Sequence, residues 1–127
     1  MRILGVDYGD TIGLALSDEG GAFAFPHAAV PCDGSEVSVI MRLCAERGIG
    51  EIVIGDTRAM NGGANPITER SDRFAEALAK ATGLPIHRER EAWSSVEAAR
   101  FAPQGDKHND ASAAAIILQR YLDRPRA

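Results

Sequence analysis

Short apolar runs separated by polar turns dominate the first part of the chain. The opening runs, 3–6 and 12–16, flank a turn that contains glycine, and this pattern predicts a β-hairpin. The stretch 22–30 predicts a third strand. Pro26 within it favours an edge strand or a bulge, because proline cannot donate a hydrogen bond to a neighbouring strand.

The rest of the chain alternates between helical and extended patterns. The predicted elements are a helix capped by Ser35 and stopped by Gly48, a strand at 51–55, a helix at 67–82, a strand at 84–91, a short helix from Ser94 and a last helix at 109–122. Hairpin-linked strands followed by alternating helices and strands imply a mixed sheet with helices on its faces. We therefore predict one α/β domain spanning residues 1–127.

Composition narrows the class of protein. The 127 residues are 45% hydrophobic and 25% charged, which is typical of a soluble globular domain. No apolar run approaches the roughly 20 residues that span a bilayer, and no signal peptide is recognisable. Cys32 and Cys44 are isolated and show no zinc-ligand spacing, so we expect reduced thiols in a cytoplasmic protein without a membrane partner.

The charge of the chain is unevenly distributed. Its net value of −4 argues against a protein coated in nucleic acid, yet residues 58–127 carry eleven Lys and Arg against nine Asp and Glu. Twelve of the fourteen cationic residues are arginines, whose planar guanidinium suits phosphate. Codon usage explains the same preference, so charge alone selects no function.

Acidic residues at the ends of predicted elements are the candidate chemistry. Asp7 should end the first strand, with Gly9 allowing a tight turn. Glu91 follows the last strand, Asp110 begins the last helix, and Asp56 follows the fourth strand as a further candidate. Strand ends converge at one edge of such a sheet, and several carboxylates there can hold two divalent ions for phosphodiester cleavage.

Each acid also has a simpler interpretation. Asp7 could cap a turn, Asp110 could cap the last helix, and Asp56 could begin a loop. Glu89 lies two residues before Glu91 on the same strand face and could serve in its place. His87 shares that face and is equally well explained as a surface histidine.

Taken together, these segments resemble the YqgF/RuvX family over nearly the whole chain. The matching pieces are Asp7-Tyr8-Gly9 with Ser17-Asp18, the strand 51–55, Met60-Asn61-Gly62, the segments 74–78 and 82–85, and the closing block 110–122. The resemblance implies an RNase H-like fold with a five-stranded mixed sheet, three strands antiparallel and the others parallel. It also implies a nuclease that uses Mg²⁺ or Mn²⁺.

Residue by residue, the resemblance carries the family's acidic positions to Asp7, Glu91 and Asp110. It departs from the family pattern in the neighbours of Glu91, where Arg90 and Ala92 replace Asp and Arg. The segment between Arg100 and Asp110 is also short. The residues that the resemblance and the arginine content suggest for nucleic-acid contact are Arg58, Asn61, Gly62, Arg70, Arg73 and Lys107.

The function implied by the resemblance is cleavage of structured RNA in 5'-end maturation of pre-16S rRNA. One alternative is a Holliday junction resolvase acting on branched DNA, which requires a two-fold dimer, so the protein is expected to be a monomer or a homodimer. Another is a binding module of the same fold that has lost catalysis, motivated by the changed neighbours of Glu91. A kinase or actin-like ATPase is set aside, because it would need a second domain.

Overall fold

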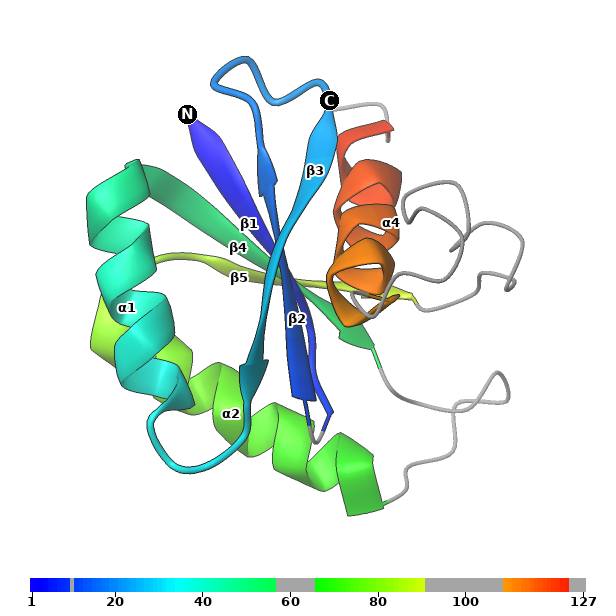
Figure 1. Ribbon diagram of the computed structural model, residues 1–127. Helices are drawn as coiled ribbons and strands as arrows, with labels where there is room; N and C mark the ends of the chain where they lie inside the picture. Colours follow the sequence, from blue (N-terminus) through cyan, green and yellow to red (C-terminus); the bar gives the residue numbers. More distant parts are fainter. Residues whose placement is uncertain (10, 57–65, 91–108, 124–127) are drawn as a thin grey trace.

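A computed structural model describes residues 1–9, 11–56, 66–90 and 109–123, in which five strands form one sheet of order β3-β2-β1-β4-β5 (Figure 1). The elements are β1 Arg2–Asp7, β2 Thr11–Ser17, β3 Ala24–Pro31, α1 Glu36–Arg47, β4 Ile49–Asp56, α2 Pro66–Thr82, β5 Ile86–Arg90 and α4 Asn109–Asp123. Strands β1, β2 and β3 pair antiparallel, while β1–β4 and β4–β5 pair parallel. This confirms the predicted α/β class and the mixed five-stranded sheet.

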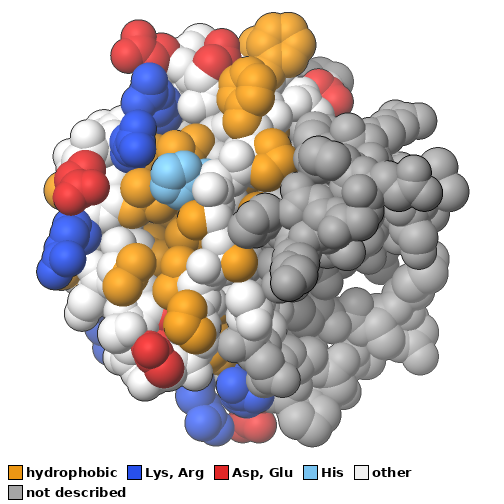
Figure 2. All heavy atoms as spheres, viewed as in Figure 1, with side chains coloured by type: hydrophobic (Ala, Val, Ile, Leu, Met, Phe, Trp, Pro, Cys, Tyr) orange, Lys and Arg blue, Asp and Glu red, His pale blue; other side chains and the backbone are white. Residues whose placement is uncertain are grey.

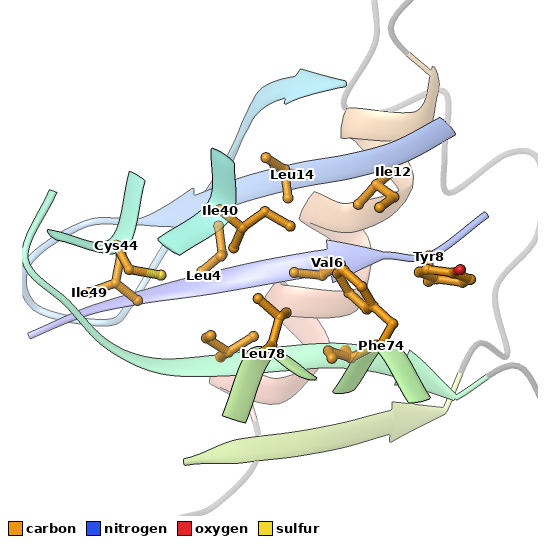
Figure 3. Packing of buried hydrophobic residues seen from close by; sticks show 12 residues of the cluster. Leu4, Val6, Tyr8, Ile12, Leu14, Ile40, Cys44, Ile49, Phe74 and Leu78 are labelled. Carbon is orange, nitrogen blue, oxygen red and sulfur yellow. The ribbon is translucent and has the colours of Figure 1, made fainter. Parts of the chain in front are cut away.

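The two faces of the sheet are covered by different helices. Helices α1 and α2 pack on one face and α4 packs on the other (Figure 1). On the first face, Figure 3 shows Ile40 of α1 beside Leu4 and Leu14, and Phe74 of α2 beside Tyr8. Burial of these large side chains supplies most of the hydrophobic stabilisation of this layer.

The face under α4 is built for close approach. Strand alternation directs Ile3 and Gly5 of β1 towards α4. A Cβ atom at Gly5 would lie 2.7 Å from Cβ of Leu118 and 2.9 Å from the carbonyl oxygen of Ala114. Helix α4 therefore lies almost directly on the backbone of β1, and its alanine-rich inner face is what makes this possible.

Strand β3 lies at the edge of the sheet and carries a bulge, which confirms both expectations from Pro26. Leu14 of β2 pairs with Ala28 and the next residue, Ala15, pairs with Pro26, so His27 is an extra residue without a position in the ladder. Such an insertion bends the strand and redirects the side chains around it.

Turn and cap predictions are confirmed in part. Gly48 ends α1 in the left-handed conformation, with φ 64°. Ser35 occupies the N-cap position but makes no capping bond; its hydroxyl and backbone N–H donate to Asp33 Oδ1 instead. The backbone of Gly9 is not left-handed, and a Cβ there would make only an ordinary contact, 3.5 Å from the carbonyl oxygen of Thr11, so nothing in its conformation requires a glycine.

The later elements follow the prediction with small shifts. Strand β5 begins at Ile86 rather than Leu84, and its described part ends at Arg90. Glu91 and the short helix predicted from Ser94 lie outside the described residues. Cys32 and Cys44 are free thiols, and burial raises the pKa of Cys44 to about 11. Within the described segments, none of the helices has the length and apolar character needed to traverse a bilayer.

Candidate functional site

Asp7 is the last residue of the central strand β1. Because Ile3 and Gly5 face α4, alternation directs Asp7 to the same face. Helix α4 runs antiparallel to β1: residues 114 and 118 contact Gly5, while Tyr121 reaches Glu51 near the start of β4. Two residues of strand match one helical turn in length, so the backbone at the start of α4 lies level with Asp7.

A second acidic side chain, Glu89, shares the row and face of Asp7. Val6 pairs with Ile54 across β1 and β4, so the register continues with Asp7 opposite Gly55. Gly55 in turn pairs with Glu89 of β5. Two strand spacings of about 4.8 Å separate the backbones of Asp7 and Glu89. The glycine between them adds no side chain to fill that space.

The neighbours of Glu89 establish which way it faces. Arg88 turns to the α2 face, where it donates to Ser71 Oγ at 3.2 Å and to Asp72 Oδ1 at 2.8 Å. His87 turns to the α4 face and stacks on Tyr121, with ring centroids 5.2 Å apart. Glu89 therefore faces α4 as well, and it is only 4% exposed. A carboxylate is rarely buried to this degree without a role in pairing or ligand binding.

The other predicted acids are placed by their backbone alone. Asp56 is the final residue of β4 and pairs with Arg90. Asp110 is the second residue of α4, so it lies within the first helical turn rather than before it. Glu91 lies outside the described residues. Among the residues whose side chains are described, no three His, Cys, Asp or Glu gather closely enough to hold a metal ion.

The residue after Asp7 brings a cation to this edge of the sheet. Tyr8 is 9% exposed and packs on Phe74, with ring centroids 4.8 Å apart. The guanidinium of Arg70, in the first part of α2, lies over the Tyr8 ring, 5.9 Å from its centroid. Arg70 therefore lies in a cation–π geometry with Tyr8, on the sheet face covered by α1 and α2, which is opposite to the face of Asp7.

The remaining predicted nucleic-acid contacts divide into two groups. Arg73 forms an exposed i,i+4 pair with Glu69 at 3.1 Å, and both side chains are more than 70% exposed. It points to solvent and is not brought to Tyr8. Arg58, Asn61, Gly62 and Lys107 lie outside the described residues.

The Tyr8 hydroxyl joins a short polar chain beneath the turn. Its oxygen lies 3.6 Å from Sγ of Cys32, and that thiol donates to Glu36 Oε2 at 3.7 Å. Burial raises the pKa of Tyr8 and the Cys32 contact raises it further, while the positive charge of Arg70 opposes both. Tyr8 is therefore neutral at physiological pH and acts as a packing platform and hydrogen-bonding group.

Sequence reasoning named Arg70 but missed its relation to Tyr8. Tyr8 and Arg70 are about sixty positions apart, and no local sequence pattern predicts a contact over that separation. The burial of Glu89 was equally hidden, because Ile86–Arg90 is rich in charged residues and reads as a solvated strand.

Comparison with known proteins places these features in a family. The sequence model of RuvX, described as "Holliday junction resolvase", matches residues 1–124. A protein named "Putative pre-16S rRNA nuclease" from Pelotomaculum thermopropionicum is 38% identical over 140 residues, covering 99% of this chain and 91% of its own length. A protein of the same name from Geobacillus kaustophilus is 36% identical over 138 residues, covering 99% of this chain and 100% of its own length.

Solved structures share the fold at low sequence identity. Thermus thermophilus RuvC in complex with a Holliday junction substrate is 14% identical, with a TM-score of 0.66 and coverage of 96% of this chain and 94% of that chain. The fowlpox virus resolvase bound to Holliday junction DNA is 10% identical, with a TM-score of 0.61 and coverage of 96% and 97%. The fold is thus RNase H-like, and the match along residues 1–124, with relatives of 36–38% identity, shows that this chain belongs to the RuvX family.

Proposed function

We propose that this protein is a metal-dependent nuclease that hydrolyses phosphodiester bonds in structured nucleic acid, with 5'-end maturation of pre-16S rRNA as its task. The observation that carries the proposal is the row of Asp7, Gly55 and Glu89, on the face where α4 begins. It combines acidic side chains at the carboxyl ends of neighbouring strands with a glycine at the position between them. Residues 1–127 would form one such domain, working in the cytoplasm.

The donor set suits a hard divalent cation. Carboxylate oxygens are the ligands that Mg²⁺ and Mn²⁺ prefer, and the row has no bulky side chain at its centre. Asp7, Glu91 and Asp110 would hold the ions, with Asp56 as a further ligand and Glu89 as the buried carboxylate beside them. When bound, the ions supply an activated water and stabilise charge on the leaving oxygen.

The protein's own residues would then position the substrate. Asp7 pairs with Gly13 of β2, and Val6 before it pairs with Ile54 of β4, so its carboxylate starts from a strand held on both sides. Arg70 offers a guanidinium over Tyr8, at the same end of β1 as Asp7, for a phosphate of the substrate. Because Arg70 already stacks on Tyr8, its side chain loses less conformational entropy when it binds a phosphate.

The choice of RNA as substrate is supported by the names of the relatives, which are 36–38% identical along almost their whole length. Branched DNA is the second candidate, favoured by the description of the RuvX family. A resolvase must place two sites on opposed strands through a two-fold dimer. A protein that stays monomeric on junction DNA and cleaves only RNA would support the first substrate.

The test combines metal binding with cleavage. Calorimetry should detect Mn²⁺ binding to the native protein and none to Asp7→Asn. With Mn²⁺ present, the native protein should cleave a pre-16S rRNA 5' fragment, and Asp7→Asn should not. Glu51→Gln removes an acid on the same sheet face but at the opposite end of β4, and it is the matched control. A folded native protein that binds no Mn²⁺ and cleaves neither RNA nor junction DNA would contradict the proposal and favour a non-catalytic binding module.

A further inference from the structure

A hollow lies at the end of the sheet opposite to Asp7. It has a volume of about 310 Å³ and opens to solvent between the start of β1, the end of β2, the start of β3 and the last turn of α1. Its lining residues are Arg2, Leu16, Ser17, Asp18, Phe25, Pro26, His27 and Arg47. A single nucleotide is of the size that such a hollow accommodates.

The bulge in β3 shapes one wall of this hollow. Phe25 pairs with Leu16 in the ladder, whereas His27 is the extra residue of the bulge. Both side chains line the hollow, and the Phe25 ring is 56% exposed. The exposed ring of Phe25, unlike that of Phe23, lines the hollow, and it offers a surface on which a base can stack.

The opposite wall carries cations. Arg2 comes from the start of β1 and Arg47 from the last turn of α1. Partial burial and, secondarily, the positive charge of Arg47 lower the pKa of His27. Figure 2 shows a histidine bordered by apolar side chains, with basic side chains to one side, on the face that β3 and α1 present.

Asp18 is the acidic residue in the lining, and its carboxylate already accepts hydrogen bonds from the backbone. Its Oδ1 accepts hydrogen bonds from the backbone N–H groups of Ala22 at 2.8 Å and Phe23 at 3.0 Å. This carboxylate fixes the loop between β2 and β3. Glu19 lies 4.0 Å from Arg2, but its side chain is 85% exposed, and an exposed pair at that distance contributes little. Arg47 and Arg2 therefore remain able to meet an anion.

We propose that this hollow binds one unpaired nucleotide of a nucleic-acid strand, with the base stacked on Phe25 and the phosphate held by Arg47 and Arg2. Exposed aromatic rings beside basic residues are how proteins hold single-stranded nucleic acid without reading its sequence. The proposal rests on the proposed function, because the substrate of a nuclease supplies such a strand. Strand β1 separates the hollow from Asp7 by about 17 Å, so the bound nucleotide lies several positions from the bond that is cut.

The test measures binding of a fluorescein-labelled, unstructured 12-nucleotide RNA in buffer with chelator, where metal-dependent cleavage is absent. Phe25→Ala and Arg47→Ala should each weaken binding by about five-fold or more. The matched controls are Phe23→Ala, which removes a ring that is 64% exposed and does not line the hollow, and Arg42→Ala on α1. Both controls should stay within about two-fold of the native affinity.

Three results would overturn the proposal. The native protein could fail to bind the RNA, Phe25→Ala could bind as tightly as Phe23→Ala, or Phe25→Ala could alter self-association in sedimentation while leaving RNA affinity unchanged. The last result would assign the exposed rings to contact between copies of this chain. Circular dichroism of every variant excludes loss of fold as the cause.

The outcome is separable from that of the proposed function. If Mn²⁺-dependent cleavage occurs and Phe25→Ala changes neither RNA affinity nor KM, the hollow is wrongly assigned and the nuclease stands. If no substrate is cleaved while binding still depends on Phe25 and Arg47, the hollow stands and the nuclease is wrong.

Discussion

Asp7 and Glu89 lie in one row of the sheet, on the same face, with only Gly55 between them. Asp7 ends the central strand, whereas Glu89 is 4% exposed on the edge strand β5. The two carboxylates come from positions 82 residues apart in the sequence. Their convergence is the feature of the fold that most directly supports a cation site.

The first prediction concerns Glu89. Glu89→Gln replaces a buried carboxyl group beside the proposed ion site, and it should lower Mn²⁺ affinity by about ten- to a hundred-fold, as loss of an outer partner of metal ligands does. Calorimetry on Glu89→Gln and on the control Glu51→Gln measures the difference. Equal Mn²⁺ affinity in the two variants would show that Glu89 is a structural acid only.

The second prediction separates two arginines on α2. Arg70 lies over Tyr8, the residue after Asp7, while Arg73 is paired with Glu69 in solvent. Arg70→Ala should weaken substrate RNA binding and lower the slope of log Kd against log salt by about 1, because one phosphate contact is lost. Arg73→Ala should leave the slope unchanged. The same loss in both variants would mean a diffuse charge effect rather than a contact at the site.

The third prediction concerns packing of α4 on β1. A Cβ at Gly5 would lie 2.7 Å from Cβ of Leu118, so Gly5→Ala should lower the free energy of unfolding by about 1–3 kcal/mol through overpacking. A Cβ at Gly9 meets nothing closer than 3.5 Å, and Gly9→Ala should be tolerated. Urea denaturation measures both. A native-like Gly5→Ala would show that α4 can move away from the sheet without cost.

The fourth prediction follows from the loop held by Asp18. Hydrogen bonds from the backbone N–H groups of Phe23 and Ala22 hold the pKa of Asp18 below its usual value of 3.8. The folded state thus favours the ionised form, so the stabilisation is present above pH 3.8 and is lost as the pH falls through the lower folded pKa. Asp18→Asn should be less stable than the native protein at pH 7, with a smaller difference near pH 3.

Urea titrations at the two pH values measure this effect, and Glu19→Gln is the control in the same loop. Its side chain is 85% exposed, and the variant should match the native protein at both pH values. A deficit of Asp18→Asn that is equal at pH 7 and pH 3 would place the contribution of Asp18 in packing rather than in its charge.

Local pattern predicted most of the elements. Apolar runs in β1, β2 and β4 and the helical spacing in α1, α2 and α4 were readable, because each element buries one face or stripe against a neighbour. Pro26 predicted the edge strand and its bulge, because a residue without a backbone N–H is tolerated at few positions in a sheet. Gly48 marked the end of α1 for a similar reason of backbone geometry. Gly9, by contrast, has no left-handed conformation, because a glycine near a turn need not have a positive φ.

The sequence by itself therefore determined the class of fold, the approximate order of elements and the family, since these follow from periodicity, turn chemistry and motif resemblance along the chain. Only the tertiary structure decided how distant side chains are placed relative to one another: Glu89 in the row of Asp7, Arg70 over Tyr8, and Phe25 across a hollow from Arg47. Strand register and helix approach set these relations. Both depend on packing between distant segments, which no local stretch of sequence encodes.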